Sequence, residues 1–196
     1  MKERIINNME IKNQTKKYSL YEEIQIPEEI IANVENNILI MKKHNQETRR
    51  KINPLIEMKI DGDKLVINSK NSKKNGRKIF GTFKAHIKNM IKGLLEGFKY
   101  KLQIVNVHFP INISYDEDKN ELVVKNFLGE NKDRRIKLEV NVDVKIDKDI
   151  IELTSFDIEK VGQSAANIEK GTRIINRDRR IYQDGVFIIE KPGGIL

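Results

Sequence analysis

The chain contains no cysteine among its 196 residues. A disulfide framework and a thiolate metal site are therefore excluded, and the composition fits a reducing cytosol. No apolar run approaches the roughly 18 to 20 residues that a membrane-spanning helix requires. The segment Met1 to Tyr18 mixes charged and amide residues with short apolar pairs. It has no apolar h-region, so we do not expect a secretory signal.

The residue sets that enzymes use for catalysis are also missing. The histidines have none of the spacings of a zinc-protease helix, and we interpret each as an ordinary surface or core side chain. Ser164 has no G-x-S-x-G context, and Gly76 to Gly81 lacks the Lys-Ser/Thr pair of a phosphate-binding loop. Asp157 and Glu159 form an isolated D-x-E that faces solvent or caps a helix. We therefore expect no catalysis, no cofactor, no metal and no small-molecule substrate.

The sequence does contain an excess of basic residues. The formal net charge is +8 at pH 7 and the sequence pI is near 9.4, which favours a polyanion as the partner. Residues 1–100 carry 21 Lys and Arg against 12 Asp and Glu, and residues 101–196 carry 16 against 17, so the halves have net charges of +9 and −1. The second half nevertheless contains a basic run from Lys170 to Arg180.

Two octapeptides that lie 81 positions apart share one pattern. Gly81 to Lys88 and Gly162 to Glu169 both fit G-x-x-x-A-[HN]-I-[KE], and both open a helical pattern. Each follows an apolar run and two extended segments joined by an Asp-rich turn. Chance similarity is the alternative, but the shared order and spacing favour one unit used twice. Such a chain is more typical of a two-headed binding module than of an enzyme with one deep pocket.

The first half predicts a series of strands followed by one long helix. The expected strands are Tyr21 to Ile26, Ile38 to Met41, Leu55 to Ile60 and Lys64 to Asn68, the last two joined by a turn at Asp61-Gly62-Asp63. Glu28 to Val34 is ambiguous between a strand and a short helix, and Lys42 to Lys51 is a loop or a strand extension. Asn68 to Lys78 is predicted as a basic loop.

The helix of the first half is expected to run from Thr82, as its N-cap, to about Gly97. Its apolar residues recur at spacings of three and four and form one buried stripe. Lys84, Lys88 and Lys92 are spaced four residues apart on another face. This row is either solvated or a ridge that contacts a phosphate backbone.

The second half predicts a similar arrangement. The expected strands are Lys101 to Val107, Leu122 to Phe127, Ile136 to Ile146, Asp149 to Leu153 and Val186 to Ile189. The alternation from Ile136 to Ile146 indicates one long strand with one buried face. A helix from Gln163 to about Thr172 has small residues that let it lie close to a sheet. After Gly171 we expect a short strand, a basic loop and an Asp184-Gly185 turn, and Pro192-Gly193-Gly194 is expected to be a loose tail.

Basic, amide and aromatic residues gather around and after this second helix. Phosphate contacts need long cationic side chains, and amide and hydroxyl donors beside them fix the register. We therefore predict an RNA-binding surface formed by Gln163, Asn167, Lys170, Arg173, Asn176, Arg177, Arg179, Arg180, Tyr182 and Gln183, with a further basic spot at Arg134 and Arg135. A secondary basic surface is predicted at Lys73, Lys74, Arg77, Lys84, Lys88 and Lys92. The alternative is a charged, solvated loop with internal pairs such as Arg179–Asp178.

An ordered series of motifs runs through the chain. The series comprises Gly81 to Gly93, Glu96 to Lys101, His108 to Ile111, Asn126 to Glu130, Asp157 to Glu169 and Arg177 to Gly185. It resembles the universal family of large-subunit ribosomal protein six in its archaeal or eukaryotic form, and the run from Gln163 to Gly185 is closer to the archaeal form. The resemblance covers roughly Tyr21 to Lys191. It implies a non-enzymatic α+β protein of two tandem repeats, each a small antiparallel sheet with one helix packed on one face.

The resemblance also implies a structural role in the large ribosomal subunit. It places the protein near the sarcin–ricin loop, the stalk base and the factor-binding region, with most RNA contacts in the second repeat. Residues that match the family's motifs, and so carry this implication, are Gln163, Asn167, Arg173, Arg177, Arg179, Arg180, Gln183 and Lys191. The implied partners are large-subunit ribosomal RNA and neighbouring ribosomal proteins, with no membrane, and the implied location is the cytoplasm, in the ribosome. A free RNA-binding or RNA-chaperone module is the alternative.

The expected organisation is an N-terminal extension at residues 1–19, a first repeat at 20–101, a second repeat at 102–190 that binds most of the RNA, and a tail at 191–196. One departure from the family pattern stands in the first repeat. The family usually has a glycine-rich turn after the second strand, whereas Met41 to Glu47 contains neither glycine nor proline. Any contact made by that turn is not implied for this chain.

Overall fold

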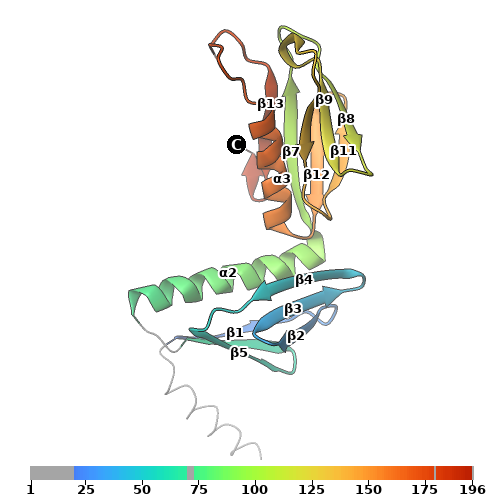
Figure 1. Cartoon of the computed structure of the whole chain (residues 1–196). Coiled ribbons are helices and arrows are strands. Elements are labelled where there is room, and N and C mark those ends of the chain that lie inside the picture. Colours follow the sequence, from blue (N-terminus) through green and yellow to red (C-terminus); the bar gives the residue numbers. More distant parts are fainter. Residues whose placement is uncertain (1–19, 70–72, 179, 196) are drawn as a thin grey trace, which may run out of the picture. The chain divides into compact units, whose positions relative to one another are not determined.

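The computed structural model describes residues 20–69, 73–178 and 180–195 and divides into two compact units, Met1–Leu95 and Glu96–Leu196. We call these unit 1 and unit 2 (Figure 1). The predicted N-terminal extension lies outside the described residues. Each unit combines antiparallel strands with a helix, which confirms the predicted α+β class.

Unit 1 consists of two three-stranded sheets, ordered β1-β6-β5 and β2-β3-β4, and one long helix. Its elements are β1 (Leu20–Gln25), β2 (Ile31–Glu35), β3 (Ile38–Lys43), β4 (Gln46–Lys51), β5 (Ile56–Asp61), β6 (Lys64–Ser69) and α2 (Lys74–Glu96). The predicted hairpin at Asp61-Gly62-Asp63 is confirmed, since Asp61 pairs with Lys64 across the turn. The ambiguous segment after Pro27 is a strand, and α2 lies along one side of the strands of this unit (Figure 1).

Unit 2 consists of a three-stranded sheet, ordered β10-β9-β8, and a five-stranded sheet, ordered β11-β12-β7-β13-β14. Its elements are β7 (Phe98–Val105), β8 (Asn112–Asp116), β9 (Glu121–Lys125), the 3-10 turn η1 (Phe127–Gly129), β10 (Arg134–Lys137), β11 (Asp143–Asp147), β12 (Ile150–Ser155), α3 (Ile158–Gly171), β13 (Gly185–Lys191) and β14 (Gly194–Ile195). The hairpin predicted around Lys148 is confirmed by the pairing of Asp147 with Ile150.

The two units repeat one topology. Each begins with a strand, continues through a three-stranded meander and a β-hairpin, and then enters its helix. In each, the first strand pairs antiparallel with the second strand of the hairpin: β1 with β6, and β7 with β12. The tandem repeat that the octapeptides predict is therefore present in the fold. Unit 2 differs by adding β13 on the other side of β7.

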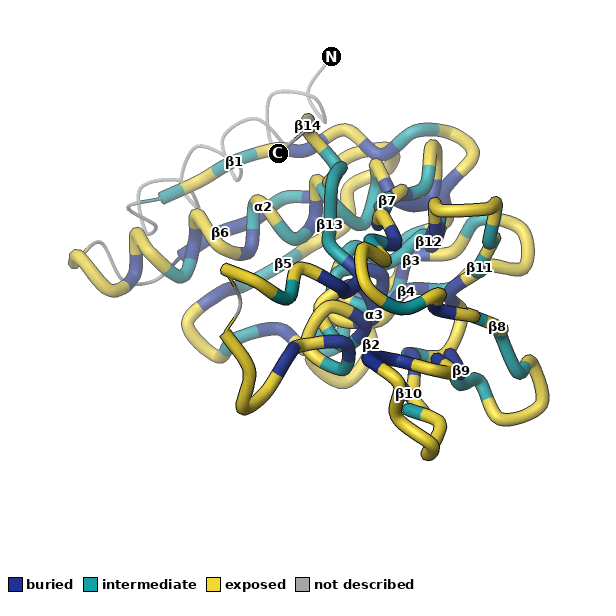
Figure 2. The backbone as a smooth tube through the Cα atoms, turned by 90° about the horizontal axis from the view of Figure 1, so that it is seen from above, coloured by how far each residue is buried: buried dark blue, intermediate teal, exposed yellow. Residues whose placement is uncertain are grey.

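The helices bury side chains of different size. α2 buries Phe80, Phe83 and Ile87, and Figure 2 shows buried and exposed positions alternating along it. α3 buries Ala165 and lies close to β7, β10, β12 and β13. A Cβ atom added to Gly162 of α3 would lie only 3.1 Å from the Tyr100 hydroxyl. The small residues of α3 thus permit a close approach to the sheet, as the sequence predicts.

The start of α2 differs from the prediction. The helix begins at Lys74, within the segment that was predicted as a basic loop. Thr82 is therefore not the N-cap, because it lies inside the helix and its hydroxyl donates to the Lys78 carbonyl at 2.9 Å. The predicted end is correct, since Gly97 follows the helix with a positive φ of 73° that glycine adopts without strain.

α3 also begins before its predicted start. Asp157 is the N-cap, and its carboxylate accepts the Glu159 N–H at 2.9 Å. Capping was one of the two roles predicted for this pair of acids. The shared octapeptides consequently lie inside the helices and do not mark their first turns.

The predicted long strand from Ile136 to Ile146 is wrong. β10 and β11 belong to different sheets, and Asn141 between them has a left-handed φ of 67°. The alternation continues across the break because in each of the two strands exposed residues alternate with less exposed ones. Val140, which the single-strand interpretation places in the core, is 66% exposed.

Two further predictions near the C-terminal end are wrong. The described residues between α3 and β13 include no short strand. Pro192 and Gly193 form the turn between β13 and β14, in which Lys191 pairs with Gly194, so this segment is not a loose tail. β14 thereby extends the larger sheet of unit 2 by one strand.

Candidate nucleic-acid interface

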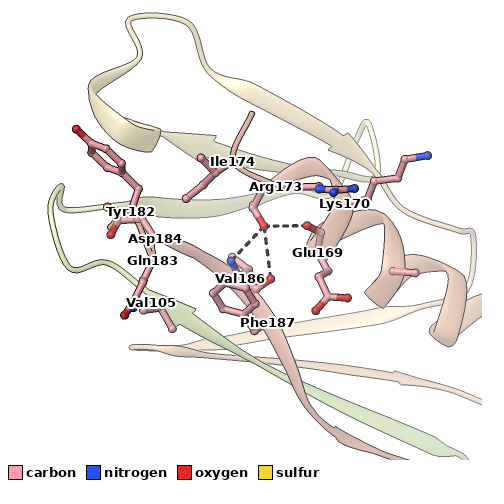
Figure 3. Close-up of a pocket in the computed structure, with 12 residues that line it drawn as sticks. Val105, Glu169, Lys170, Arg173, Ile174, Tyr182, Gln183, Asp184, Val186 and Phe187 are labelled. Carbon is pink, nitrogen blue, oxygen red and sulfur yellow. Dashed lines mark hydrogen bonds between the residues drawn. The ribbon is translucent and has the colours of Figure 1, made fainter. Parts of the chain in front are cut away.

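A groove opens in unit 2 between the end of α3 and the start of β13 (Figure 3). Its volume is about 720 Å³. Four predicted RNA contacts line it together: Lys170, Arg173, Tyr182 and Gln183. We call the segment 172–184 the groove loop; its residues Thr172 to Ile174 and Tyr182 to Asp184 line the groove. The fold therefore brings a central part of the predicted surface to one concave site.

Thr172 joins the two secondary-structure elements that border the groove. It is almost fully buried, its hydroxyl donates to the Ile168 carbonyl at 3.0 Å, and the same oxygen accepts the Val186 N–H at 3.1 Å. This hydroxyl also lies 3.4 Å from the Glu169 carbonyl and 3.5 Å from the Val186 carbonyl. The hydroxyl thus holds the last turn of α3 against the first residues of β13.

Asp184 anchors the other end of the groove loop and is only 1% exposed. Its carboxylate accepts the N–H groups of Val107 at 2.8 Å, His108 at 3.1 Å and Phe109 at 3.2 Å, and it lies 3.3 Å from Nδ1 of His108. Burial raises the pKa of Asp184. The three N–H donors and the imidazole together lower it by more than burial raises it, so the net pKa is below its ordinary value. The loop is thereby tied to the segment after β7 by an ionised carboxylate.

A column of three side chains in successive contact, His108, Tyr182 and Arg177, begins at Asp184. The rings of His108 and Tyr182 are tilted by 39° with centroids 5.1 Å apart, and the Arg177 guanidinium lies 5.0 Å from the Tyr182 ring centroid. The column leads from a buried carboxylate to an exposed guanidinium. Arg177 and Tyr182 therefore hold a flat, cationic surface beside the groove.

Arg134 fixes the beginning of the groove loop. Its Nη1 donates to the carbonyls of Gly171 at 3.0 Å and Arg173 at 3.2 Å, and its Nε and Nη2 donate to Glu130 at 2.8 and 2.6 Å. The guanidinium also lies 4.0 Å from the Phe127 ring centroid. Its hydrogen bonds lower the pKa of Glu130 against the smaller, opposing effect of burial. The donors of Arg134 are thus engaged inside unit 2, where they position the loop.

The predicted amide pair lies on α3, outside the lining of the groove. Nε2 of Gln163 donates to Oδ1 of Asn167 at 2.8 Å, and Nδ2 of Asn167 lies 3.4 Å from the Lys137 carbonyl. Gln163 is exposed and Asn167 half-buried. The pair holds polar groups at the surface in a defined orientation.

The remaining predicted contacts are dispersed. Arg180 forms a forked ion pair with Asp178, at 3.1 and 2.8 Å, and its side chain is 90% exposed. Arg135 lies 3.7 Å from Glu121, Asn176 has a left-handed φ of 60°, and Lys191 is the last residue of β13. Arg179 lies outside the described residues. An internal pair was the alternative prediction for this loop, and the structure contains one, with Arg180 as the partner of Asp178.

The secondary basic surface belongs to unit 1. Lys73 immediately precedes α2, and Lys74, Arg77, Lys84, Lys88 and Lys92 lie within it. Within this set, the ammonium group of Lys84 pairs with Glu22 at 2.6 Å. The predicted row of Lys84, Lys88 and Lys92 is therefore not uniformly available to a partner.

The three residues that shape the groove most were not predicted as part of the site. These residues are Thr172, Asp184 and His108, and each acts through contacts with residues far away in the sequence. Asp184, for example, is 76 positions from His108 and 77 from Val107, to which it is hydrogen-bonded. The one local signal was an acidic residue before Gly185, which we interpreted as a turn. Hydrogen bonds of this range leave no periodicity in the sequence.

The groove presents two basic side chains, an amide and an aromatic ring, those of Lys170, Arg173, Gln183 and Tyr182. Within residues 20–69, 73–178 and 180–195, no cluster of His, Cys, Asp or Glu has the arrangement of a metal site. In the same part of the chain, no helix has the length and apolar character needed to cross a membrane. The fold and the groove define a class: a tandem α+β repeat protein that presents basic, amide and aromatic side chains for binding.

Comparisons with known proteins identify the family within that class. The family model for ribosomal protein L6 matches residues 109–185, which include the whole groove loop. The chain is 40% identical over 176 residues to large ribosomal subunit protein uL6 of Methanococcus vannielii, covering 89% of this chain and 96% of that protein. It is 39% identical over 171 residues to the uL6 protein of Haloarcula marismortui, covering 87% and 95%. The chain therefore belongs to the uL6 family, in its archaeal form, which confirms the resemblance.

Proposed function

We propose that the protein binds large-subunit ribosomal RNA through the groove of unit 2, near the sarcin–ricin loop, the stalk base and the factor-binding region. The uL6 family is a structural, non-enzymatic component of the large ribosomal subunit, and membership supports a role in translation as part of a ribonucleoprotein. The partners are ribosomal RNA and neighbouring large-subunit proteins. The protein works in the cytoplasm, in the ribosome.

The observation that supports the proposal most strongly is the convergence of basic, aromatic and amide side chains at one anchored groove. Lys170 and Arg173 supply cations for phosphate oxygens, and Gln183 supplies an amide for register. The stack of His108, Tyr182 and Arg177 ends in an exposed guanidinium plane, on which an unpaired base can stack. The combination suits RNA better than a simple anion, because a simple anion needs no stacking surface.

The anchors of the groove loop contribute to affinity because they reduce the conformational entropy that the loop loses when RNA binds. Each flexible side chain or loop that is immobilised on binding costs free energy, so a loop already fixed at both ends costs less. Thr172 and Arg134 fix its beginning, and Asp184 fixes its end. We assign these three residues a positioning role and assign direct RNA contact to the side chains that line the groove.

The test is incorporation into large subunits. Lys170→Glu together with Arg173→Glu reverses two charges at the groove, and the matched control, Lys125→Glu with Lys145→Glu, makes the same change at exposed strand positions outside it. Sedimentation through a high-salt wash should show the groove variant in free fractions and the control in large subunits, with circular dichroism verifying that both fold. Normal incorporation of the groove variant would contradict the assignment. A wild-type chain found only in free fractions would instead favour a free RNA-binding module.

A further inference from the structure

The exposed side of α2 carries cations that have no partner within the described residues. The side chains of Lys74, Arg77, Lys78 and Lys88 are exposed and form neither an ion pair nor a hydrogen bond with another described residue. This is unlike Lys84, whose ammonium group is held by Glu22 at 2.6 Å. We call these four residues, with Gly81 and Ala85 between them, the cationic face of α2.

Helical geometry places the cationic face opposite the core. At 100° per residue, Lys74, Lys78, Gly81, Ala85 and Lys88 fall within about 80° of one another around the helix. The buried side chains of Phe83 and Ile87 point the other way. From Lys74 to Lys88 the face extends about 21 Å, at 1.5 Å per residue. It is therefore a continuous strip, long enough to follow several phosphate groups.

The charges of this strip oppose the stability of their own helix. A helix N-terminus carries a partial positive charge, so cations are unfavourable in the first turns and acids are unfavourable in the last. α2 has no acidic residue in its first turn and no basic residue in its last, and it ends at Glu96. A polyanion laid along the strip would neutralise the cations near the N-terminus of the helix and so reduce this penalty.

Gly81 has no explanation inside the unit. A Cβ atom added there would meet nothing within 4 Å, and its φ is not in the left-handed region. Gly162, at the same place in the second octapeptide, is explained by the Tyr100 hydroxyl 3.1 Å from its added Cβ. With exposed Ala85 one turn later, Gly81 leaves a low strip between Lys78 and Lys88 where another backbone can approach closely.

We propose that the cationic face of α2 binds the phosphate backbone of an RNA duplex, as a second RNA contact separate from the groove of unit 2. Three of its four cations are lysines, whose compact ammonium groups suit phosphate contacts that do not depend on sequence. An acidic protein is a poorer fit, because the centres of protein interfaces are depleted of charge and rich in large apolar side chains. No large apolar residue is exposed between Lys74 and Lys88.

The test isolates this contact from the groove. The full chain with Lys170→Glu and Arg173→Glu serves as the background, and its binding to a 20-base-pair RNA duplex is followed by fluorescence anisotropy over a range of KCl concentrations. Adding Lys74→Gln, Lys78→Gln and Lys88→Gln should weaken binding about 10-fold or more, and should lower the salt slope by roughly 0.9 for each phosphate that the protein no longer neutralises. The matched control adds Lys59→Gln, Lys125→Gln and Lys145→Gln, three exposed strand lysines, and should change affinity less than about twofold.

The possible outcomes separate the two proposals. Loss of all duplex binding in the background chain, before α2 is changed, would overturn the second contact and leave the groove proposal intact. An equal effect of the control lysines would reduce the contact to diffuse attraction and would also overturn it. Poly-glutamate that competes as well as duplex RNA at equal charge would point to an acidic protein instead.

A single substitution tests the close approach. Gly81→Gln introduces a side chain into open space and replaces a poor helix former, so the unfolding temperature of unit 1 should rise by a few degrees. The same variant should bind the RNA duplex several-fold more weakly, because the added side chain keeps the phosphate backbone away. Unchanged or tighter binding by this more stable variant would sink the proposal.

Discussion

α2 and α3 occupy the same position in two copies of one topology, yet they are stabilised in opposite ways. α3 has a side-chain cap at Asp157, an acid in its first turn at Glu159 and a base in its last turn at Lys170. α2 has no acid in the first turn and no base in the last, and it contains three interior glycines. Each unfavourable end charge costs about 0.3 to 1 kcal/mol and each interior glycine about 1 kcal/mol relative to alanine.

The comparison shows that burial decides whether α2 forms. Its buried Phe80, Phe83, Ile87 and Leu94 each contribute about 1.5 to 3 kcal/mol, which exceeds the sum of its local penalties. α3 is consistent at every level, with favourable caps, charges and close packing. The charges of α3 thus agree with the stability of the helix. On the exposed side of α2, the cations near the N-terminus oppose the stability of the helix.

The largest effect is expected from removing Asp184, the anchor of the groove loop in unit 2, which has no counterpart beside α2. Asp184→Ala leaves three backbone N–H groups and one imidazole without their acceptor, so we expect a loss of about 3 to 5 kcal/mol in the free energy of unfolding of unit 2. Urea denaturation measures it. A loss below about 1 kcal/mol would show that water replaces the carboxylate and that the loop is not anchored there.

The same anchor predicts a pH dependence. Because the folded pKa of Asp184 is lowered, its carboxylate stabilises the folded state above the unfolded pKa of about 3.9 and loses this effect as the pH falls through the folded value. The stability difference between the wild type and Asp184→Asn should therefore be constant near neutral pH and shrink below about pH 4. A difference that grows on acidification would have the wrong sign.

The next effect contrasts two glycines. A Cβ atom at Gly171 would lie 2.6 Å from Cγ1 of Ile136, a buried and branched side chain with little room to move, so Gly171→Ala should cost about 1 to 3 kcal/mol. Gly81→Ala meets nothing and should instead gain about 1 kcal/mol. Paired denaturation curves measure both, and equal signs would mean that the two helices do not differ as described.

The smallest effect reverses charges at the two helix starts. Glu159→Lys should destabilise unit 2 by about 0.3 to 1 kcal/mol, and Lys74→Glu should stabilise unit 1 by a similar amount. Both effects should decrease in high salt, because they are electrostatic and exposed. Thermal unfolding at low and high KCl provides the measurement, and salt-independent shifts would assign them to helix propensity.

The parts of this molecule that follow from local pattern could be predicted, and those that depend on distant contacts could not. The hairpin at Asp61-Gly62-Asp63 and the apolar stripe from Phe83 depend on neighbours in sequence, and both are present. The start of α2 was missed because Lys74 to Gly81 combines cations with glycines and has no capping signal. The break at Asn141 was missed because two strands of the same alternation lie on either side of it.

The candidate site divides in the same way. The residues that line the groove, such as Lys170 and Tyr182, were predicted from their chemistry. The residues that hold the groove in shape, Thr172 and Asp184, were not, because a buried hydroxyl and a buried carboxylate are recognised only by their partners. Arg134 was predicted as an RNA contact because its charge is visible in the sequence. Its four hydrogen bonds to Glu130, Gly171 and Arg173, which give it a positioning role, are visible only in the structure.

The position of β7 between β12 and β13 has a consequence for the order in which the protein is made. The strands of unit 1 and α2 are complete before β7 is synthesised, so unit 1 can fold on emerging. β7 can pair with β12 as soon as β12 has been synthesised. Its other neighbour, β13, follows only after α3 and the groove loop, and there Gly185 pairs with Val105. The contact of Thr172 with Val186 and those of Asp184 with Val107 and Phe109 form only at that moment. A nascent chain that has not yet reached residue 191 can therefore fold its first unit before the groove of unit 2 is complete.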